Sequence, residues 1–221
     1  MTENFDQFCS KFLYESVNDD EYLAAVEADD METAQRMVNE AAEYRGIPSG
    51  IVFHISKQPI TKFKNEYKTD LSSMGFHFGT EAQANFRGGQ YDFSADNPIM
   101  NRVFLKLRNP LRVSHMESYA PEWLADKMIA DELLDEDEWV DWNEEQYLPT
   151  EVERGTYLVD QLKKWKYDGL VYANDKEGAG DSYVPFDPNQ IKSADPITRN
   201  NSGNIIPLSS RFDSSKDDIR Y

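Results

Sequence analysis

Two short apolar runs in the last quarter of the chain constrain the fold more than any other feature. Residues 169–173 and 182–186 are rich in β-branched and aromatic side chains, and a charged loop containing Gly178 and Gly180 separates them. This pattern predicts the two strands of a β-hairpin, and Pro188 is expected to stop the second strand. The connecting loop is longer and more charged than a turn requires. The hairpin alone fits ordinary surface structure as well as it fits a loop that carries a site.

The N-terminal part of the chain predicts helices. Over residues 1–46, apolar side chains recur at every third or fourth position, which is typical of helices packed along one face. Asp29 and Asp30 fall where a short turn would separate two helices, with Asp30 as an N-cap. Gly46 and Pro48 are expected to close the segment. We expect a helical hairpin packed on the main domain rather than a separate partner-binding module.

From residue 50 the apolar period changes to two, which predicts strands. The expected strands are residues 51–56, 76–78 and 102–107. Thr80 precedes a short helical stretch over residues 81–87, and its hydroxyl is suited to cap the first turn. Gly88 and Gly89 are expected to end that helix. Residues 90–101 are expected to form a loop.

The remaining segments complete an α+β pattern. Residues 115–166 are mostly helical in pattern and strongly acidic, and their length suits an insertion between two strands, with the charge run as a solvated face. Residues 197–221 are polar and are expected to form an extended tail. We therefore expect an N-terminal helical segment (1–46), a main domain with a mainly antiparallel sheet (47–196) and a polar tail.

Composition narrows the function classes. Hydrophobic residues make up 39% of the 221 residues, enough for a core, and the formal charge is 23 − 41 = −18. Such an acidic excess argues against a protein whose whole surface grips phosphate backbones, although one local basic patch could still meet a nucleic acid. Cys9 is the only cysteine, so no disulfide framework is expected. No signal peptide or membrane span is recognisable, and we expect a cytoplasmic protein.

Several catalytic motifs are absent from the sequence. There is no dinucleotide-binding glycine pattern, phosphate loop, zinc-protease motif or nucleophile elbow. His54, His77 and His115 do not have metal-ligand spacing, so no metal is expected. His54 and His77 lie at strand positions next to small polar residues, which weakly favours a ligand pocket over two structural histidines.

Three motifs carry a family resemblance. They are DSYVPFDPNQIKSA, which begins with the second strand of the hairpin, GLVYAN, which contains its first strand, and GFHFGTEAQANFR, which spans residues 75–87. Their order resembles the ADP-ribosyltransferase fold in its His-Tyr-Glu branch, that of diphtheria toxin and poly-ADP-ribose polymerases. More narrowly, the chain resembles the small ADP-ribosyltransferase domains of phage and prophage polyvalent proteins and of bacterial toxin systems. It covers about residues 20–221 and implies a mainly antiparallel, split-sheet α+β fold.

The resemblance implies a set of NAD-binding residues. The family's first motif is a strand ending in His-Gly-Ser/Thr, and His54 and Ser56 match it, with Ile55 where glycine is expected. In a competing alignment, His77 and Gly79 form that motif. The spacing to the following helix favours His54.

The family's second motif is a short strand followed by a helix that carries a nicotinamide-stacking tyrosine. Phe86 occupies the tyrosine position and retains a ring for stacking. Arg87, Lys57 or Lys62 would meet the pyrophosphate of NAD, or they are solvated surface cations.

The third motif departs from the family. Its catalytic glutamate would stand at Ser182, which supplies a hydroxyl but no charge. The chemistry requires a carboxylate that stabilises positive charge on the ribose as nicotinamide leaves. Asp181 or Glu177 would then supply it, with Glu177 also deprotonating the acceptor.

The resemblance implies a function, and the missing glutamate leaves alternatives open. It implies an enzyme that uses NAD as co-substrate to mono-ADP-ribosylate a macromolecule, protein or nucleic acid, in phage–host conflict or as a toxin. An antitoxin or another partner protein is then expected. The alternatives are a catalytically inactive protein-interaction module and an NAD glycohydrolase.

Overall fold

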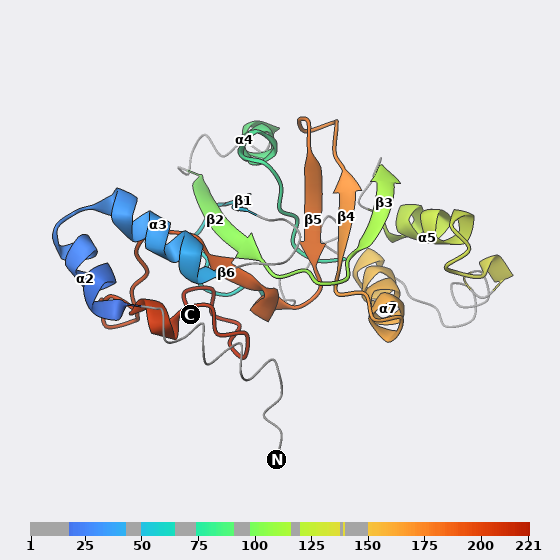
Figure 1. The fold of residues 1–221 in the computed structure, drawn as a ribbon. Coiled ribbons are helices and arrows are strands. Elements are labelled where there is room, and N and C mark those ends of the chain that lie inside the picture. The colour runs from blue at the N-terminus through green and yellow to red at the C-terminus, as the bar shows by residue number, and fades with distance from the viewer. Residues whose placement is uncertain are drawn as a thin grey trace, which may run out of the picture.

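The computed structural model describes residues 18–42, 50–64, 74–90, 98–115, 120–137, 139 and 150–221, which form an α+β fold (Figure 1). One three-stranded sheet has the order β1 (Val52–Ser56), β2 (Ile99–Leu105), β6 (Ile191–Ser193). The other has the order β3 (Leu111–His115), β4 (Gly169–Ala173), β5 (Asp181–Pro185). Neighbouring strands are antiparallel except for the parallel pair β3–β4. The predicted hairpin is confirmed as β4 and β5.

A short segment joins the two sheets. Phe78 exchanges two backbone hydrogen bonds with Tyr183 of β5, of 2.8 and 2.9 Å. Gly79 does the same with Phe53 of β1, at 2.9 and 3.1 Å. In place of the strand predicted over residues 76–78, the structure has two isolated bridges, at Phe78 and Gly79. Through them β1 and β5, which lie far apart in the sequence, flank the same short segment.

Two helices cover the first sheet at the left of Figure 1. They are α2 (Asp19–Glu27) and α3 (Met31–Ala42). Asp30 accepts a hydrogen bond of 3.1 Å from the backbone of Thr33, which confirms the predicted cap. Buried side chains of both helices pack against Phe104 of β2 and Leu208 near the C-terminal end. The predictions for residues 1–17 and 43–46 lie outside the described residues.

The second sheet packs against α5 (Pro121–Ala130) and α7 (Glu151–Lys164), at the right of Figure 1. Leu124, Leu158 and Leu170 are fully buried in this core, and an ion pair between Arg154 and Glu122 joins the two helices. Among the described helices, none is long and apolar enough to cross a membrane.

The predicted bounds of α4 (Glu81–Gln90) and β2 are wrong. The helix α4 does not end at Gly88 and Gly89 but continues through both. A Cβ atom on Gly88 would lie 2.4 Å from Ile55 Cδ1, so the glycine allows α4 to pack closely on β1. β2 begins at Ile99 rather than residue 102, because Ile99 pairs with Ser56. β3 was not predicted.

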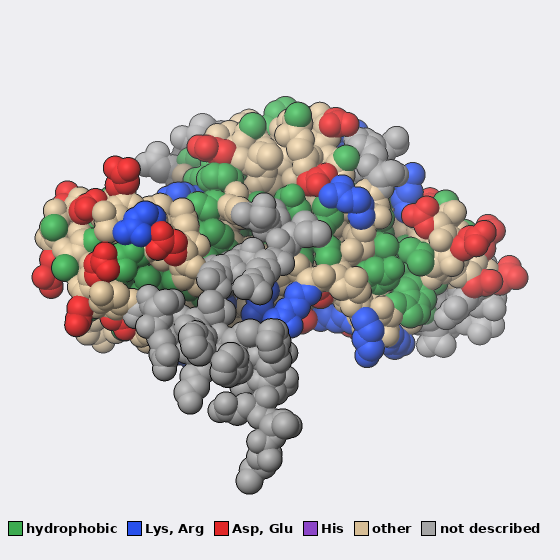
Figure 2. Space-filling view, in the orientation of Figure 1, with side chains coloured by type: hydrophobic (Ala, Val, Ile, Leu, Met, Phe, Trp, Pro, Cys, Tyr) green, Lys and Arg blue, Asp and Glu red, His purple; other side chains and the backbone are tan. Residues whose placement is uncertain are grey.

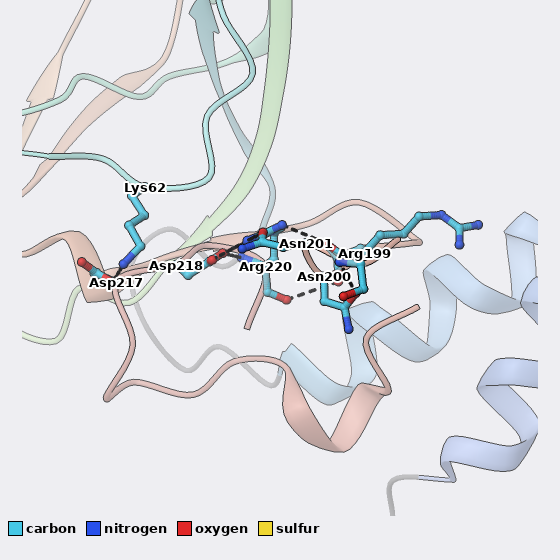
Figure 3. Close-up of polar contacts among 9 residues, drawn as sticks. Lys62, Arg199, Asn200, Asn201, Asp217, Asp218 and Arg220 are labelled. Atoms are coloured by element: carbon cyan, nitrogen blue, oxygen red, sulfur yellow. Dashed lines mark hydrogen bonds and ion pairs between the residues drawn. The ribbon is translucent and has the colours of Figure 1, made fainter. Parts of the chain in front are cut away.

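The C-terminal segment closes one side of the first sheet (Figure 3). The backbone of Ile219 donates to Thr61 at 2.9 Å and accepts from Ser193 of β6 at 2.7 Å. Arg220 donates to both carboxylate oxygens of Asp218, at 2.7 and 2.9 Å, and its guanidinium also reaches Asn201 at 2.9 Å. The segment predicted as an extended tail is thus tied to the sheet by backbone and side-chain bonds.

Candidate active site

Gln83 holds the β4–β5 loop against α4. Its Oε1 accepts from the backbone of Thr80 at 2.8 Å while the Thr80 hydroxyl accepts from the backbone of Gln83, so the pair forms a capping box. Its Nε2 donates to three loop carbonyls, those of Asn174, Gly178 and Gly180, at 3.2, 2.8 and 3.2 Å. The first turn of α4 therefore fixes the backbone of the loop.

Asn174 links the two residues that the sequence singled out in this region. Its Nδ2 donates to Glu177 Oε2 at 2.8 Å and to Ser182 Oγ at 3.0 Å. Ser182 is 3% exposed, and its hydroxyl donates to Gln83 Oε1 at 3.3 Å. The carboxylate of Glu177 consequently lies one amide group away from the position where the resemblance expects a glutamate.

Phe86 and Arg87 are consecutive residues of α4. Arg87 Nε forms an ion pair of 3.1 Å with Glu177 Oε1, and the glutamate side chain is only 11% exposed. Phe86 is 42% exposed. The structure thus brings Arg87 into contact with Glu177, and it leaves an aromatic ring open to solvent beside them.

His77 lies on the same side of the second sheet as Ser182. The bridge between Phe78 and Tyr183 sets this register, since residues on either side of a bridge point to the opposite face. His77 Nδ1 is 2.9 Å from the hydroxyl of Tyr172, the cross-strand partner of Ser182. Burial lowers the pKa of His77 to about 3, and the positive charge of Arg87 contributes to the shift. His77 is therefore a neutral imidazole at physiological pH.

His54 points to the other face of the sheet. Its ring centroid lies 5.3 Å from those of Phe63 and Phe78 and 6.3 Å from that of Phe76. His54 Nδ1 is 2.9 Å from the carbonyl oxygen of His77, so this nitrogen is the donor. Burial lowers the pKa of His54 as well. His54 supports the backbone of His77, but its side chain does not join the network around Ser182.

Asp181 is also directed away from that network. Successive side chains of a strand point to opposite faces, and the carboxylate of Asp181 forms a two-pronged ion pair with Arg112, of 2.6 and 3.1 Å. Between the two candidate carboxylates, only Glu177 is connected to Ser182.

The other candidates lie outside the network. Ser56 Oγ accepts from Asn101 Nδ2 at 2.8 Å, and Asn101 lines a cavity of about 250 Å³ between β2 and the C-terminal segment. Lys62 pairs with Asp217 at 2.7 Å. Gly79 is buried, and its backbone is occupied by β1. No group of three His, Cys, Asp or Glu side chains suited to a metal occurs in the described part of the chain.

Ile55 stands where the resemblance expects glycine. It points towards α4, because its Cδ1 lies where a side chain on Gly88 would be placed. The isoleucine therefore fills space between β1 and the helix that carries Phe86 and Arg87. This arrangement narrows the approach of a ligand to the backbone at this position.

Two residues of the network were missed in the sequence, Gln83 and Asn174. Thr80-x-x-Gln83 carries the capping-box signal, which could have identified Gln83 as a helix-start residue. Its second role, the binding of three carbonyls that lie some ninety positions later in the chain, leaves no local pattern. Asn174 directly follows β4, a position typical of asparagine in turns.

Comparison with known families identifies one family that matches most of the chain. The family described as ADP-ribosyltransferase in polyvalent proteins matches residues 43–204, about three-quarters of the chain. No curated protein and no solved structure matches. The matched range contains both sheets, α4 and the whole polar network around Ser182. The chain belongs to the ADP-ribosyltransferase family found in polyvalent proteins.

Proposed function

We propose that this chain is a mono-ADP-ribosyltransferase that cleaves NAD and transfers ADP-ribose to a macromolecule, with Glu177 in the role of the family's catalytic glutamate. The observation that carries the proposal is the link through Asn174, whose amide donates to both Glu177 and Ser182. Membership of the family supports ADP-ribosylation with NAD as the general function. The identity of the carboxylate and the nature of the acceptor are our inference.

The proposed chemistry assigns separate tasks to Ser182 and Glu177. As the bond between ribose C1′ and nicotinamide N1 breaks, its electron pair leaves with nicotinamide and positive charge develops on the ribose. A carboxylate held close to that charge lowers the barrier. Glu177 supplies the charge and Ser182 a hydroxyl for the ribose. The acceptor nucleophile then bonds to C1′ and gives its proton to Glu177.

The residues present fit NAD in part. The exposed ring of Phe86 is suited to stack on nicotinamide, and Arg87 beside it is suited to a pyrophosphate oxygen. His77, neutral and bonded to Tyr172, is the histidine on this face. We assign it the contact with NAD, and we assign His54 the support of the His77 backbone.

Arg87 would couple NAD binding to the release of Glu177. In the free chain Arg87 Nε pairs with Glu177 at 3.1 Å, and its positive charge offsets the negative charge of the carboxylate. A pyrophosphate carries more negative charge than one carboxylate and competes for the guanidinium. When Arg87 moves to the pyrophosphate, the charge of Glu177 becomes available to the ribose.

A second candidate function is favoured by Ile55. Because its side chain fills the space under α4, NAD access is restricted, and the chain would then be a catalytically inactive module that binds a partner protein. An NAD glycohydrolase is the third possibility, in which water replaces the acceptor.

Membership of the family supports a biological setting for the proposed activity. ADP-ribosyltransferase domains in polyvalent proteins support a role in phage–host conflict, as an effector or as the toxin of a toxin–antitoxin pair with a protein antitoxin. Expression of the chain in a bacterial host should then slow growth. The Glu177→Gln variant should not.

The test uses NAD labelled in its adenylate, with and without cell lysate. It measures two quantities: the free nicotinamide released, and the label transferred to a macromolecule with ADP-ribose. Release that depends on lysate, with label on a macromolecule, supports transfer, and Glu177→Gln should lower the rate about 100- to 1000-fold. Asp175→Asn removes the same charge from an exposed position of the same loop and should leave the rate unchanged.

Each rival has its own outcome. Release that needs no lysate identifies a glycohydrolase. If neither release nor NAD binding is detected, the inactive module is the correct function. If Glu177→Gln retains full activity, the chain is an enzyme but Glu177 is not its carboxylate.

A further inference from the structure

The end of α7 exposes an aromatic ring among cations. The sequence here is Lys163-Lys164-Trp165-Lys166, and Trp165 is 41% exposed. Among the described residues it is one of two large hydrophobic side chains that are exposed, and the other, Phe86, belongs to the candidate active site. Lysines in the last turn complement the helix dipole, but that role does not explain an exposed tryptophan between them.

The backbone presents this ring rigidly. Tyr167 donates to the carbonyl of Leu162 and Lys166 to that of Lys163, both at 3.0 Å, which is the hydrogen-bond pattern of a Schellman motif. Lys166 takes the position where glycine is common and has a φ of 71°. Tyr167 then packs against the core. Trp165 is therefore fixed at the surface and is not part of a mobile end.

A second group of cations lies beside the first. The turn between β2 and β3 carries Lys106 and Arg108, and it is tied to the end of α7 because Asn109 Nδ2 donates to the carbonyl of Lys166 at 2.9 Å. Asp168 accepts from the backbone of Arg108 at 2.6 Å, which adds a second tie. We call this surface the basic edge; its residues are Lys106, Arg108, Lys163, Lys164, Trp165 and Lys166.

Most charges of the basic edge have no ion-pair partner among the described residues. Lys163 pairs with Asp187 at 2.7 Å. Within the described part of the chain, no carboxylate lies within ion-pair distance of the remaining four cations, which are Lys106, Arg108, Lys164 and Lys166. Figure 2 shows Lys and Arg side chains along the lower edge of the molecule, below the strands and α7, whereas Asp and Glu dominate its two flanks. In a chain of net charge −18, this local concentration is unusual.

We propose that the basic edge binds single-stranded nucleic acid. Proteins that bind single strands combine aromatic side chains, on which bases stack, with cations that follow the phosphates. Trp165 supplies the platform, and Lys106, Arg108, Lys164 and Lys166 supply the phosphate contacts. A single strand is the expected form, because the bases of a duplex are already stacked on each other.

This binding goes beyond the proposed transfer reaction and does not depend on it. The basic edge lies at the end of β4 where α7 arrives, and the β4–β5 loop with Glu177 lies at the opposite end of that strand (Figure 1). Binding can therefore be measured without NAD. If the chain is also a transferase, an edge of this kind would hold a nucleic acid as acceptor.

The test is fluorescence anisotropy with labelled 12-nucleotide strands of thymidine and of uridine. Binding should weaken linearly on a log–log plot against salt, with a slope of about −0.7 for each phosphate contacted. Four contacts give a slope near −3 and a loss of about 50-fold in affinity between 50 and 200 mM salt. No binding to either strand at 50 mM salt overturns the proposal.

Variants locate the binding surface. Trp165→Ala should weaken binding about 5- to 150-fold, whereas Trp165→Phe, which keeps a ring, should retain most of it. Lys164→Gln with Lys166→Gln should reduce the salt slope by about 1.4. Arg36→Gln is the matched control, because Arg36 is an exposed cation of α3, paired with Glu40, and should change neither quantity.

Two further probes separate other partners. If a poly-glutamate peptide binds as tightly as the strands and Trp165→Ala does not discriminate between them, the surface takes an acidic protein and the proposal is wrong. If a 12-base-pair duplex binds equally well and independently of Trp165, the single-strand assignment is wrong. Each variant's far-ultraviolet circular dichroism and melting temperature establish that it is folded.

Discussion

Arg87 and Glu177 join α4 to the β4–β5 loop by an ion pair of 3.1 Å between Nε and Oε1. Both side chains are mostly shielded from water, with exposed fractions of 27% and 11%. Removing one partner of such a pair leaves the other charge poorly solvated. Arg87 therefore governs both where the loop lies and how much charge its candidate catalytic carboxylate presents.

Gln83→Glu should loosen the β4–β5 loop without removing it. The substitution keeps the oxygen that accepts from Thr80, but it replaces the donor to three loop carbonyls with an acceptor. The Gly180 carbonyl keeps a second donor, the backbone of Asn174, but each buried carbonyl left without a donor costs about 1–3 kcal/mol. Hydrogen exchange of residues 174–180 should accelerate at least tenfold. Gln161→Glu makes the same change on α7 and is the control. Equal protection in both variants would contradict this role of Gln83.

Adjacent glycines of α4 should respond to alanine in opposite directions. A Cβ atom on Gly88 would lie 2.4 Å from Ile55 Cδ1, whereas one on Gly89 would have no heavy atom within 4 Å. Gly89→Ala should therefore stabilise the fold by up to about 1 kcal/mol through helix propensity. Gly88→Ala should destabilise it by about 1–3 kcal/mol through overpacking. Urea unfolding midpoints measure both, and equal shifts would show that α4 does not pack on Ile55 as described.

Substitution of His77 and of His54 should affect the kinetics of nicotinamide release differently. His77→Ala removes the imidazole on the Ser182 face, together with its contact to Tyr172, and should lower kcat/KM for nicotinamide release by at least 100-fold. His54→Ala removes a donor to the His77 carbonyl and should lower stability more than catalysis, by about 1–3 kcal/mol. The reverse pattern, with His54→Ala inactive and His77→Ala active, would restore His54 as the ribose-binding histidine.

Stability should fall as the pH is lowered from 6.5. The pKa of His77 is about 3 in the folded chain and about 6.5 in an unfolded one, so between these values only the unfolded state binds the proton. The free energy of unfolding should decrease by up to about 1.4 kcal/mol per pH unit below about pH 6. The buried His54, whose pKa is also lowered, acts in the same direction.

A variant tests whether His77 causes this pH dependence of stability. In His77→Gln the amide can still bond the Tyr172 hydroxyl but does not titrate, so the decrease between pH 6.5 and 4.5 should be smaller than in the parent chain. Urea unfolding at four pH values measures the difference. Identical slopes in both proteins would mean that protonation of His77 is not linked to unfolding.

Local patterns were sufficient to predict the hairpin and its loop. Residues 169–173 form an unbroken apolar run and become β4 with the predicted bounds. Glu177 was singled out because the resemblance requires a carboxylate near Ser182 and the charged loop before it supplies one. β3 was missed because its five residues follow Pro110 directly and carry Arg112 and Ser114. Its partner is a parallel strand more than fifty residues away, and no local signal reports such a pairing.

The sequence could not predict which side of the sheet each candidate side chain faces. Asp181 and Glu177 were equal candidates, and only the register of β5 separates them, since it directs Asp181 to Arg112. Similarly, the bridge from Gly79 to Phe53 places His54 on the face opposite Ser182. A shift of one residue in either pairing would exchange these outcomes.

The interleaved order of the strands has a consequence for how the chain reaches its native state. The first sheet contains β1, β2 and β6, and the whole of the second sheet lies between β2 and β6 in the sequence. The first sheet is therefore incomplete until β3, β4 and β5 have found their places. Such long-range pairings slow folding, because loop closure must precede the contacts that reward it. The two sheets should consequently unfold as one cooperative unit, with no stable half-molecule to accumulate or to be excised.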